Sequence, residues 1–233
     1  MRAYHERIWE ALPEGLEPPY FRERLAFLLG QLSAVGQLSA VGQLGAGGEG
    51  PARSAPPGPP EPLRVLDVGC GEGHFAAALH DAGLRVTGLD IAAVALRRAH
   101  AREAQLDLRL LEAEDRWPLA DASFDVVWAG EVIEHVLDTA DWLSELRRVL
   151  RSGGRLLLST PAHDPLALLG LALRPRAFAA HFEPRGDHLR FYSRASLTAL
   201  LADFGFEQPR LRGLGGPPGA RRLLLVAARR SRF

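Results

Sequence analysis

The sequence predicts an α/β protein with a mostly parallel β-sheet and helices on both of its faces. Beyond residue 62, short apolar runs alternate with segments of helical periodicity, which is the pattern of successive β/α units. The chain of 233 residues is 47% hydrophobic and 24% charged, ordinary values for a globular protein long enough to bury a core. Its 28 basic and 28 acidic residues cancel, which argues against broad electrostatic binding to nucleic acid.

Composition divides the chain into three parts. Residues 1–36 are expected to form an N-terminal helical lid, which three prolines break into two pieces. Residues 37–62 are expected to be a flexible linker, because they continue a six-residue repeat that begins at Gln31 and then become rich in Pro, Gly and Ala. Residues 63–233 form the main domain, in which 161–194 are expected to be a second lid over the site.

The elements of the main domain follow from the spacing of apolar residues and from the turn signals between them. Gly205, directly after Phe204, is a helix-stop signal. The glycine cluster Gly213–Gly219 separates two late strands, which are expected to form a closing hairpin whose last strand is antiparallel. The expected strands are 64–68, 85–89, 107–111, 124–129, 154–159, 206–211 and 222–228, and the expected helices are 73–82, 92–104, 137–150 and 195–203.

A glycine-rich turn follows the first strand. Gly69, Gly71 and Gly73 allow the backbone to pass close to a ligand. A dinucleotide fingerprint would need a glycine where this chain has His74. Asp67, at the end of the strand, would repel a pyrophosphate and attract an ammonium group. The turn therefore favours a ligand other than a dinucleotide.

Polar residues also follow the next strands. Asp90 lies about 20 residues after the glycines, where a carboxylate can bind the two hydroxyls of a ribose. Alternatively, it caps the helix predicted at 92–104. Glu112 and Ala113 follow the third strand and could meet an adenine, or belong to a solvated acidic loop. With Gly130 after the fourth strand, these residues converge on the sheet edge where open parallel sheets bind ligands.

Four segments together resemble the class I methyltransferases that use S-adenosylmethionine. They are Val65–Phe75, Gly88–Ile91, Trp117–Val127 and Leu150–Arg155, and the resemblance covers roughly residues 63–228. It implies a Rossmann-like seven-stranded sheet with S-adenosylmethionine under the glycine turn. The cofactor-binding residues that it implies are Asp67, Gly69, Cys70 and Gly71 at the methionine part, Asp90 and Ile91 at the ribose, Glu112 and Ala113 at the adenine, and Gly130.

The segment Glu131-Val-Ile-Glu134-His135 carries the candidate catalytic groups. A helix here would place both carboxylates and the imidazole on one face. His188 could join them to hold Mg²⁺, Mn²⁺ or Zn²⁺. The layout is similar to that of the O-methyltransferases of ubiquinone biosynthesis and of the small-RNA 2′-O-methyltransferases, in which matching residues are associated with a divalent metal. The predicted catalytic residues are His135 and Glu131, and the predicted metal ligands are Glu131, Glu134, His135 and His188.

The same residues also allow other roles for this segment. Glu131 could only shape the donor pocket, Glu134 could cap a helix or pair with an arginine, and His135 could act as a base or merely pack. The favoured function is methyl transfer to the hydroxyl of a small molecule. The alternatives are 2′-O-methylation of RNA ends, a nicotinamide-dependent oxidoreductase, and a donor-binding protein without catalysis.

The expected partners follow from charge and hydropathy. The neutral net charge disfavours a nucleic-acid acceptor and favours a small molecule. The apolar run Pro165–Leu173 is expected to be a lid helix buried against the domain, although weak contact with a membrane surface is an alternative. No stretch reads as a signal peptide or a transmembrane span. The single Cys70 is typical of a reducing compartment, so we expect a cytoplasmic protein.

Overall fold

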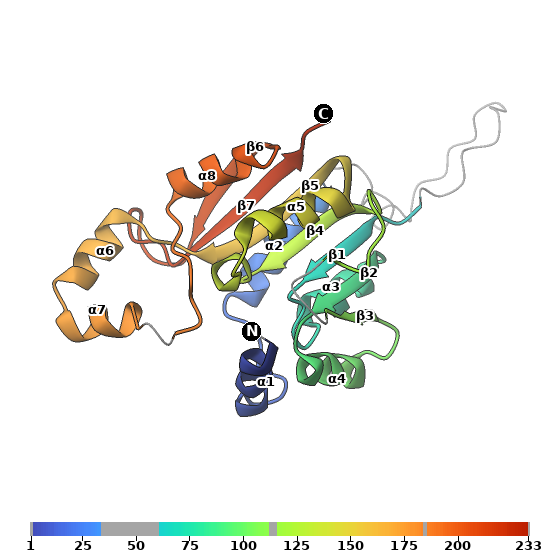
Figure 1. The fold of residues 1–233 in the computed structure, drawn as a ribbon, viewed down its shortest axis with the longest axis horizontal. Coiled ribbons are helices and arrows are strands. Elements are labelled where there is room, and N and C mark those ends of the chain that lie inside the picture. Colours follow the sequence, from blue (N-terminus) through green and yellow to red (C-terminus); the bar gives the residue numbers. More distant parts are fainter. Residues whose placement is uncertain (1, 34–60, 112–115, 184–185, 233) are drawn as a thin grey trace, which may run out of the picture.

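The structure is a computed structural model, and it describes residues 2–33, 61–111, 116–183 and 186–232. In this part of the chain seven strands form one sheet in the order β3-β2-β1-β4-β5-β7-β6 (Figure 1). Strand β7 is antiparallel to both of its neighbours, and the other pairings are parallel. The predicted mostly parallel sheet with an antiparallel last strand is confirmed. The strands are β1 (Arg64–Val68), β2 (Arg85–Asp90), β3 (Asp107–Leu110), β4 (Phe124–Gly130), β5 (Leu150–Pro161), β6 (Phe206–Leu214) and β7 (Leu223–Arg230).

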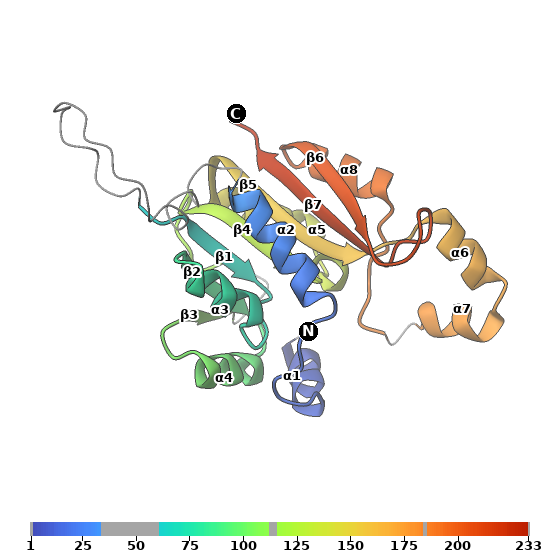
Figure 2. The same ribbon diagram turned by 180° about the vertical axis from the view of Figure 1, so that it is seen from behind.

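Helices cover both faces of the sheet. On one face α5 and α8 pack against the strands, and the view from behind shows α2 and α3 on the other face (Figure 2). The helices are α1 (Arg2–Ala11), α2 (Phe21–Ser33), α3 (His74–Asp81), α4 (Ala93–Arg102), α5 (Thr139–Val149), α6 (Pro165–Ala172), α7 (Pro175–His181) and α8 (Arg194–Asp203), with a short 3₁₀ turn η1 (Ile133–His135).

Alternate residues of the central strands supply the two cores. Leu66 of β1 and Val127 of β4 belong to the core under α5 and α8, whereas their neighbours Val65 and Val126 belong to the core under α2 and α3. This alternation is the period of two that a strand imposes on its side chains. Each fully buried leucine or valine stabilises the fold by about 1.5–3 kcal/mol. The sheet is thus held from both sides, which fixes the carboxyl ends of its strands.

The hairpin of α6 and α7 extends away from this body (Figure 1). No residue of either helix is buried, and Leu166, Leu169 and Leu173 are 60%, 57% and 75% exposed. The expectation that the run Pro165–Leu173 is buried against the domain is therefore wrong. Eight apolar residues with almost no polar face can form a helix, but this pattern does not say what they pack against.

Two further expectations concern the linker and membrane-spanning segments. The linker expected at 37–62 lies, apart from its last two residues, outside them. Among the helices of the described ranges, none is long and apolar enough to cross a membrane.

Candidate active site

A cavity of about 290 Å³ opens at the carboxyl ends of β1, β2 and β4. Helix α1 forms one wall, and the strand ends, the segment after β4 and α5 form the others. This is the edge at which the sequence predicted a ligand. The residues that line it include His5, Ile8, Trp9, Leu12, Gly69, Asp90, Ile91, Trp117, Glu131, His135, Val136, Trp142, Glu145 and Asp187.

Hydrogen bonds from its backbone N–H groups hold the glycine turn in place. The N–H groups of Gly69 and Cys70 both donate to the carbonyl of Leu89, at 2.7 and 3.2 Å, and the N–H of Gly71 donates to a carboxylate oxygen of Asp90 at 2.8 Å. Gly71 has φ +55°, and a Cβ there would lie 2.8 Å from the ring of Trp9. The glycines therefore admit the close approach of α1, while their N–H groups are already bonded within the protein.

Cys70 contributes its backbone rather than its thiol. The thiol is buried against Gly88, where an added Cβ would lie 2.9 Å from the sulfur. Burial raises the pKa of the Cys70 thiol well above its usual range. A buried, protonated thiol of this kind is inert and serves packing.

Asp90 is buried and accepts two backbone hydrogen bonds. One oxygen binds Gly71, and the other binds the N–H of Ala92 at 2.8 Å, directly before α4. Burial raises the pKa of the Asp90 carboxyl. Asp90 thus supports the start of α4, as one of the two sequence interpretations expected, and it also lines the cavity together with Ile91.

The first turn of α4 is capped by α1, which the sequence analysis missed. The carboxylate of Glu6 accepts hydrogen bonds from the N–H groups of Ala93 and Val94 at 2.8 and 3.0 Å. A carboxylate suits this position because a helix N-terminus carries a partial positive charge. Nothing local marks the residue, since its partners lie 87 and 88 positions further along the chain.

Glu72, inside the glycine turn, forms a second hydrogen-bonded contact with the N-terminal segment. Its side chain is 1% exposed and accepts a hydrogen bond from the N–H of Gly15 at 2.7 Å. Arg98 and Arg102 of α4 pair with it at 3.0 and 3.4 Å. Together, Glu6 and Glu72 hold the N-terminal segment over the glycine turn.

Asp67 and Arg24 lie beneath the turn, out of contact with solvent. Asp67 is 1% exposed, and its Oδ2 atom has no hydrogen-bond partner among the described residues. Burial and the charge of Asp90 raise the pKa of Asp67 to about 8, against the opposing effect of Arg24. An unpartnered buried carboxylate oxygen is costly, and a cationic group of a ligand would satisfy it.

Arg24 is a buried cation that the sequence analysis did not single out. It is 2% exposed, and its guanidinium lies 4.8 Å from the ring of Phe75 and 5.5 Å from that of Trp128. An added Cβ on Gly130 would collide with its Nη2 atom. Its position in the apolar helix α2 could have drawn attention, because arginine is rarely buried without a function or a partner.

The segment after β4 is not the helix that the sequence predicted. Glu131 has φ +60°, and only Ile133–His135 form a 3₁₀ turn. The N–H of Glu131 donates to the carbonyl of Ser159, and the Ser159 hydroxyl donates to its carboxylate at 2.7 Å. This attachment to β5 holds Glu131 out of the turn, so the expected shared helical face does not exist.

Glu134 and His135 nevertheless lie together. Glu134 is 1% exposed; its Oε2 atom accepts from the hydroxyl of Thr160 at 3.0 Å, and its Oε1 atom has no hydrogen-bond partner in the described part of the chain. Burial and the nearby Glu131 raise the pKa of Glu134 to about 8. Its Oε1 atom lies 4.0 Å from Nε2 of His135.

The protonation of His135 follows from its neighbour. Its Nδ1 atom lies 2.8 Å from the carbonyl oxygen of Asp187. A carbonyl oxygen only accepts, so Nδ1 carries the proton and Nε2 presents a lone pair. Burial lowers the pKa of the His135 imidazole, which favours this neutral form.

His188 reaches the same place from a distant part of the chain. Its ring centroid lies 4.9 Å from that of His135. One ligand atom each of Glu134, His135 and His188 lies within 4.8 Å of the others, inside the limit of about 5 Å expected for a shared ion. Glu131 is not in this group, although the sequence analysis placed it among the metal ligands.

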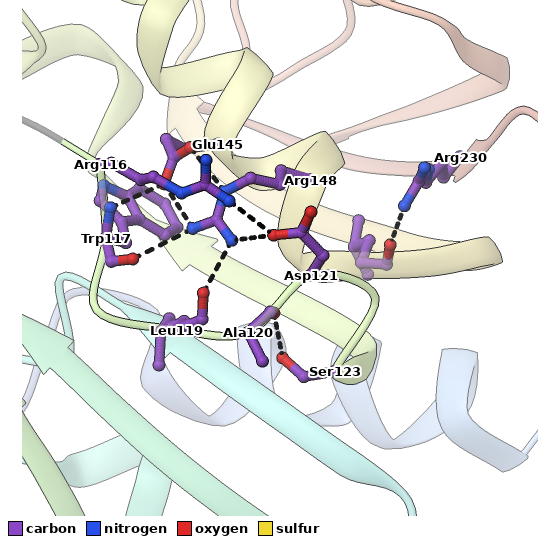
Figure 3. A network of polar contacts seen from close by, with 10 residues as sticks. Arg116, Trp117, Leu119, Ala120, Asp121, Ser123, Glu145, Arg148 and Arg230 are labelled. Carbon is purple, nitrogen blue, oxygen red and sulfur yellow. Dashed lines mark hydrogen bonds and ion pairs between the residues drawn. The ribbon is translucent and has the colours of Figure 1, made fainter.

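A polar network positions the opposite wall of the cavity (Figure 3). Glu145 accepts from the N–H of Trp117 at 2.7 Å, and Arg148 donates to the carbonyls of Trp117 and Leu119 at 3.1 and 2.7 Å. Arg148 also pairs with Glu145 and Asp121, which raises the pKa of its guanidinium. These bonds hold the backbone of Trp117, whose side chain lines the cavity. Glu112 and Ala113, which were predicted to meet the adenine, lie outside the described residues.

A Rossmann-like sheet with a glycine turn, an acid after β2 and a cavity between them is the architecture of a protein that binds a nucleoside-containing cofactor. Residues 46–208 match the family of methyltransferase domains. The chain belongs to this family, the class I methyltransferases that use S-adenosylmethionine. Membership decides against the nicotinamide-dependent alternative.

Relatives of known name agree with this family. The chain is 38% identical over 149 residues to a probable S-adenosylmethionine-dependent methyltransferase of Mycolicibacterium smegmatis, covering 61% of this chain and 51% of the relative. It is 34% identical to a ubiquinone biosynthesis O-methyltransferase of Thiobacillus denitrificans, covering 65% of this chain and 67% of the relative. The chain thus spans between about half and two thirds of the length of these relatives.

Solved structures show the same fold. A methyltransferase of Methanosarcina mazei superposes with a TM-score of 0.59 at 23% identity, covering 73% of this chain and 93% of that one. A possible histamine N-methyltransferase of Thermotoga maritima gives 0.61 at 21% identity, covering 99% of this chain and all of that one. At these identities the likeness concerns the fold alone.

Proposed function

We propose that this protein transfers a methyl group from S-adenosylmethionine to the hydroxyl of a small apolar molecule, with His135 as the general base. The observation that carries this proposal is the hydrogen bond from His135 Nδ1 to the Asp187 carbonyl, which leaves a lone pair on Nε2 of a residue that lines the cavity. An acceptor hydroxyl must lose its proton, and a neutral imidazole with a fixed tautomer is suited to take it.

The buried polar groups under the glycine turn fit S-adenosylmethionine. The unpartnered Oδ2 of Asp67 would receive its ammonium group, and the guanidinium of Arg24 would face its carboxylate. Asp90 would bind the ribose hydroxyls and Ile91 would pack beside them, while Trp117 offers an aromatic surface. When bound, S-adenosylmethionine supplies an activated methyl group on its sulfonium.

The residues of the chain then perform two tasks. The locked turn and the lid α1 hold both reactants in the cavity, and such alignment alone accounts for much of the acceleration of a transfer reaction. His135 would accept the hydroxyl proton at Nε2 as the acceptor oxygen bonds to the methyl carbon and the bond from that carbon to the donor sulfur breaks, with S-adenosylhomocysteine as the leaving group. The Asp187 carbonyl keeps the Nδ1 proton bonded, which stabilises the imidazolium that results.

A divalent cation is the second candidate for activating the acceptor. Glu134, His135 and His188 offer one oxygen and two nitrogens in a group that fits Mg²⁺, Mn²⁺ or Zn²⁺. A cation there would lower the pKa of Glu134 and of a coordinated hydroxyl, and it would replace His135 as the activating group. Removal of metal distinguishes the two mechanisms.

The walls of the cavity favour an apolar acceptor. Ile8, Leu12, Val136 and Trp142 line it, and the described part of the cavity contains no arginine that would bind an RNA phosphate. Relatives named for ubiquinone biosynthesis are O-methyltransferases. A phenolic small molecule therefore fits better than an RNA 3′ end.

The test is a transfer assay with labelled S-adenosylmethionine against phenols, catechols, carboxylic acids and small-RNA 3′ ends, with and without chelator. We expect methylation of a phenol or catechol that persists in chelator and is lost in His135→Gln. The matched control is His100→Gln, which removes an exposed imidazole from α4. Loss in chelator with restoration by Mg²⁺ or Mn²⁺ would establish the metal mechanism instead. Transfer only to RNA ends or carboxylic acids would contradict the proposed acceptor.

A further inference from the structure

A second cavity, of about 150 Å³, lies at the other end of the sheet from the active site. Its walls are Gln31 at the end of α2, Arg155 in the middle of β5, Gln208 and Arg210 of β6, and the stretch Ala227–Arg229 of β7. From Arg155 to Thr160, which contacts Glu134, β5 rises about 17 Å. This cavity is therefore separate from the one that holds the candidate catalytic groups.

Three arginines and no acid line this cavity, and the nearest acid by register, Glu207, is the cross-strand partner of Arg229 on β6 but forms no ion pair with it among the described residues. Arg155 and Arg229 are direct cross-strand partners, so their side chains share one face of the sheet. Arg210 is opposite Ala227, two residues before Arg229, and so belongs to the same face. Within the described ranges none of the three forms an ion pair, and like charges directly opposite one another destabilise a sheet.

The charges of the neighbouring arginines act on the guanidinium of Arg155. Burial together with the charges of Arg229 and Arg210 lowers the pKa of its guanidinium. Its Nη1 atom donates to the carbonyl of Gln31 at 2.9 Å and to the side-chain oxygen at 3.4 Å. These neutral acceptors orient the guanidinium but do not neutralise it.

The backbone beside the arginines is irregular. The pairing of β6 with β7 shifts register between Glu207 and Arg210, and Gln208 within this bulge has φ +50°. A bulge redirects the side chains of its strand, and backbone in this region is strained for a residue with a Cβ. Here the bulge brings Gln208 and Arg210 to the cavity.

We propose that this cavity binds a small phosphate-bearing anion, held by Arg155, Arg210 and Arg229. Guanidinium groups bind phosphate oxygens through paired N–H donors, and Gln31 and Gln208 add neutral donors beside them. The cavity is half open to solvent and of the size of one phosphate group with its waters, whereas a nucleic-acid site is a groove that follows several nucleotides. The neutral net charge of the chain points the same way.

The test is calorimetric titration of the full chain with inorganic phosphate, at an ionic strength held constant with chloride. We expect saturable binding, a melting temperature that rises by several degrees at saturation, and a loss of affinity of about tenfold or more in Arg210→Gln and in Arg229→Gln. Both side chains are exposed and both substitutions relieve repulsion with Arg155, so folding is not at risk. Arg155→Lys keeps the charge but not the paired donors, and we expect it to weaken binding as well.

The matched control is Arg85→Gln, which removes an exposed arginine at the start of β2, outside the cavity. It should bind phosphate as the unaltered chain does, and all variants should keep the affinity for S-adenosylhomocysteine. No phosphate binding above the chloride background would overturn the proposal, and so would an equal loss in Arg85→Gln. Binding of a single-stranded oligonucleotide without binding of phosphate would also overturn it and assign the arginines to nucleic acid.

Discussion

The two sides of the main cavity are built differently. On the donor side, Gly71 of the glycine turn donates to Asp90, and Glu72 and Glu6 accept backbone hydrogen bonds that tie the N-terminal segment to the turn and to α4. On the acceptor side, Glu134 keeps a buried oxygen without a described partner. The α6–α7 hairpin beyond it buries no residue. Each side thus keeps a buried carboxylate oxygen without a described hydrogen-bond partner, Oδ2 of Asp67 or Oε1 of Glu134, but the donor side is in addition covered by a helix that hydrogen bonds hold in place.

Among the polar residues around the cavity, Glu72 on the donor side should have the largest effect on stability. Replacing Glu72 by alanine leaves the N–H of Gly15 and the guanidinium of Arg98 without their buried acceptor, and we expect a loss of about 3 kcal/mol in the free energy of unfolding. Urea denaturation followed by circular dichroism measures this loss. The control is Glu14→Ala, an exposed site where we expect less than about 0.5 kcal/mol. Equal losses in the two variants would show that the N-terminal segment is not tied to the turn as described.

Asp90 should affect the donor more than the fold. We expect Asp90→Asn to weaken binding of S-adenosylmethionine at least tenfold, because hydrogen bonds to a charged acceptor contribute about 1.5–3 kcal/mol. Calorimetry measures the affinity, and far-ultraviolet circular dichroism checks the fold. Asp81→Asn, at an exposed aspartate at the end of α3, is the matched control. Unchanged affinity in a folded Asp90→Asn protein would remove the ribose role.

The donor side should also impose a pH dependence. With a pKa of about 8, Asp67 is mostly protonated at neutral pH, and it must lose this proton to pair with the ammonium group of the donor. Affinity for S-adenosylhomocysteine should therefore rise with pH by up to about tenfold per unit and level off above about pH 8. Asp90 and Arg24 are the charged groups that face Asp67, and both remain in Asp67→Asn, which should lose the slope. A flat profile between about pH 6 and 8 would contradict this assignment.

The smallest effect should come from the α6–α7 hairpin. Leu173 is 75% exposed, so we expect Leu173→Ser to change the free energy of unfolding by less than about 0.5 kcal/mol. Leu143 of α5 is fully buried, and Leu143→Ala should cost about 2–5 kcal/mol. Thermal melts of the two variants compare them directly. A large loss in Leu173→Ser would mean that the hairpin is covered by a partner.

The sequence predicted the donor side better than the acceptor side, for a physical reason. A turn that must approach a ligand needs glycine, and a buried parallel strand needs a continuous apolar run. Gly69–Gly73 and β1 can therefore be recognised from the local sequence alone. The carboxylate of Asp90 follows at a fixed distance along the chain. The mostly parallel sheet could likewise be predicted from the alternation of strands and helices along the chain.

Features that depend on distant partners could not be predicted. Glu6 caps a helix 87 residues away, and Arg24 reaches Phe75 and Trp128 from a helix before the main domain. Glu131 leaves the expected helix because Ser159 of β5 holds it. The apolar period of α6 indicated a helix without indicating a partner, and the burial expected for it was wrong.

The central claim is that donor binding and proton removal are assigned to opposite sides of one cavity. It is tested most directly by measuring S-adenosylhomocysteine affinity and transfer rate together in His135→Ala and Asp90→Asn. We predict that His135→Ala binds as the unaltered chain does while transfer falls by about 10²–10⁴-fold, and that Asp90→Asn loses affinity at least tenfold. A loss of affinity in His135→Ala with transfer preserved at saturating donor would contradict the account.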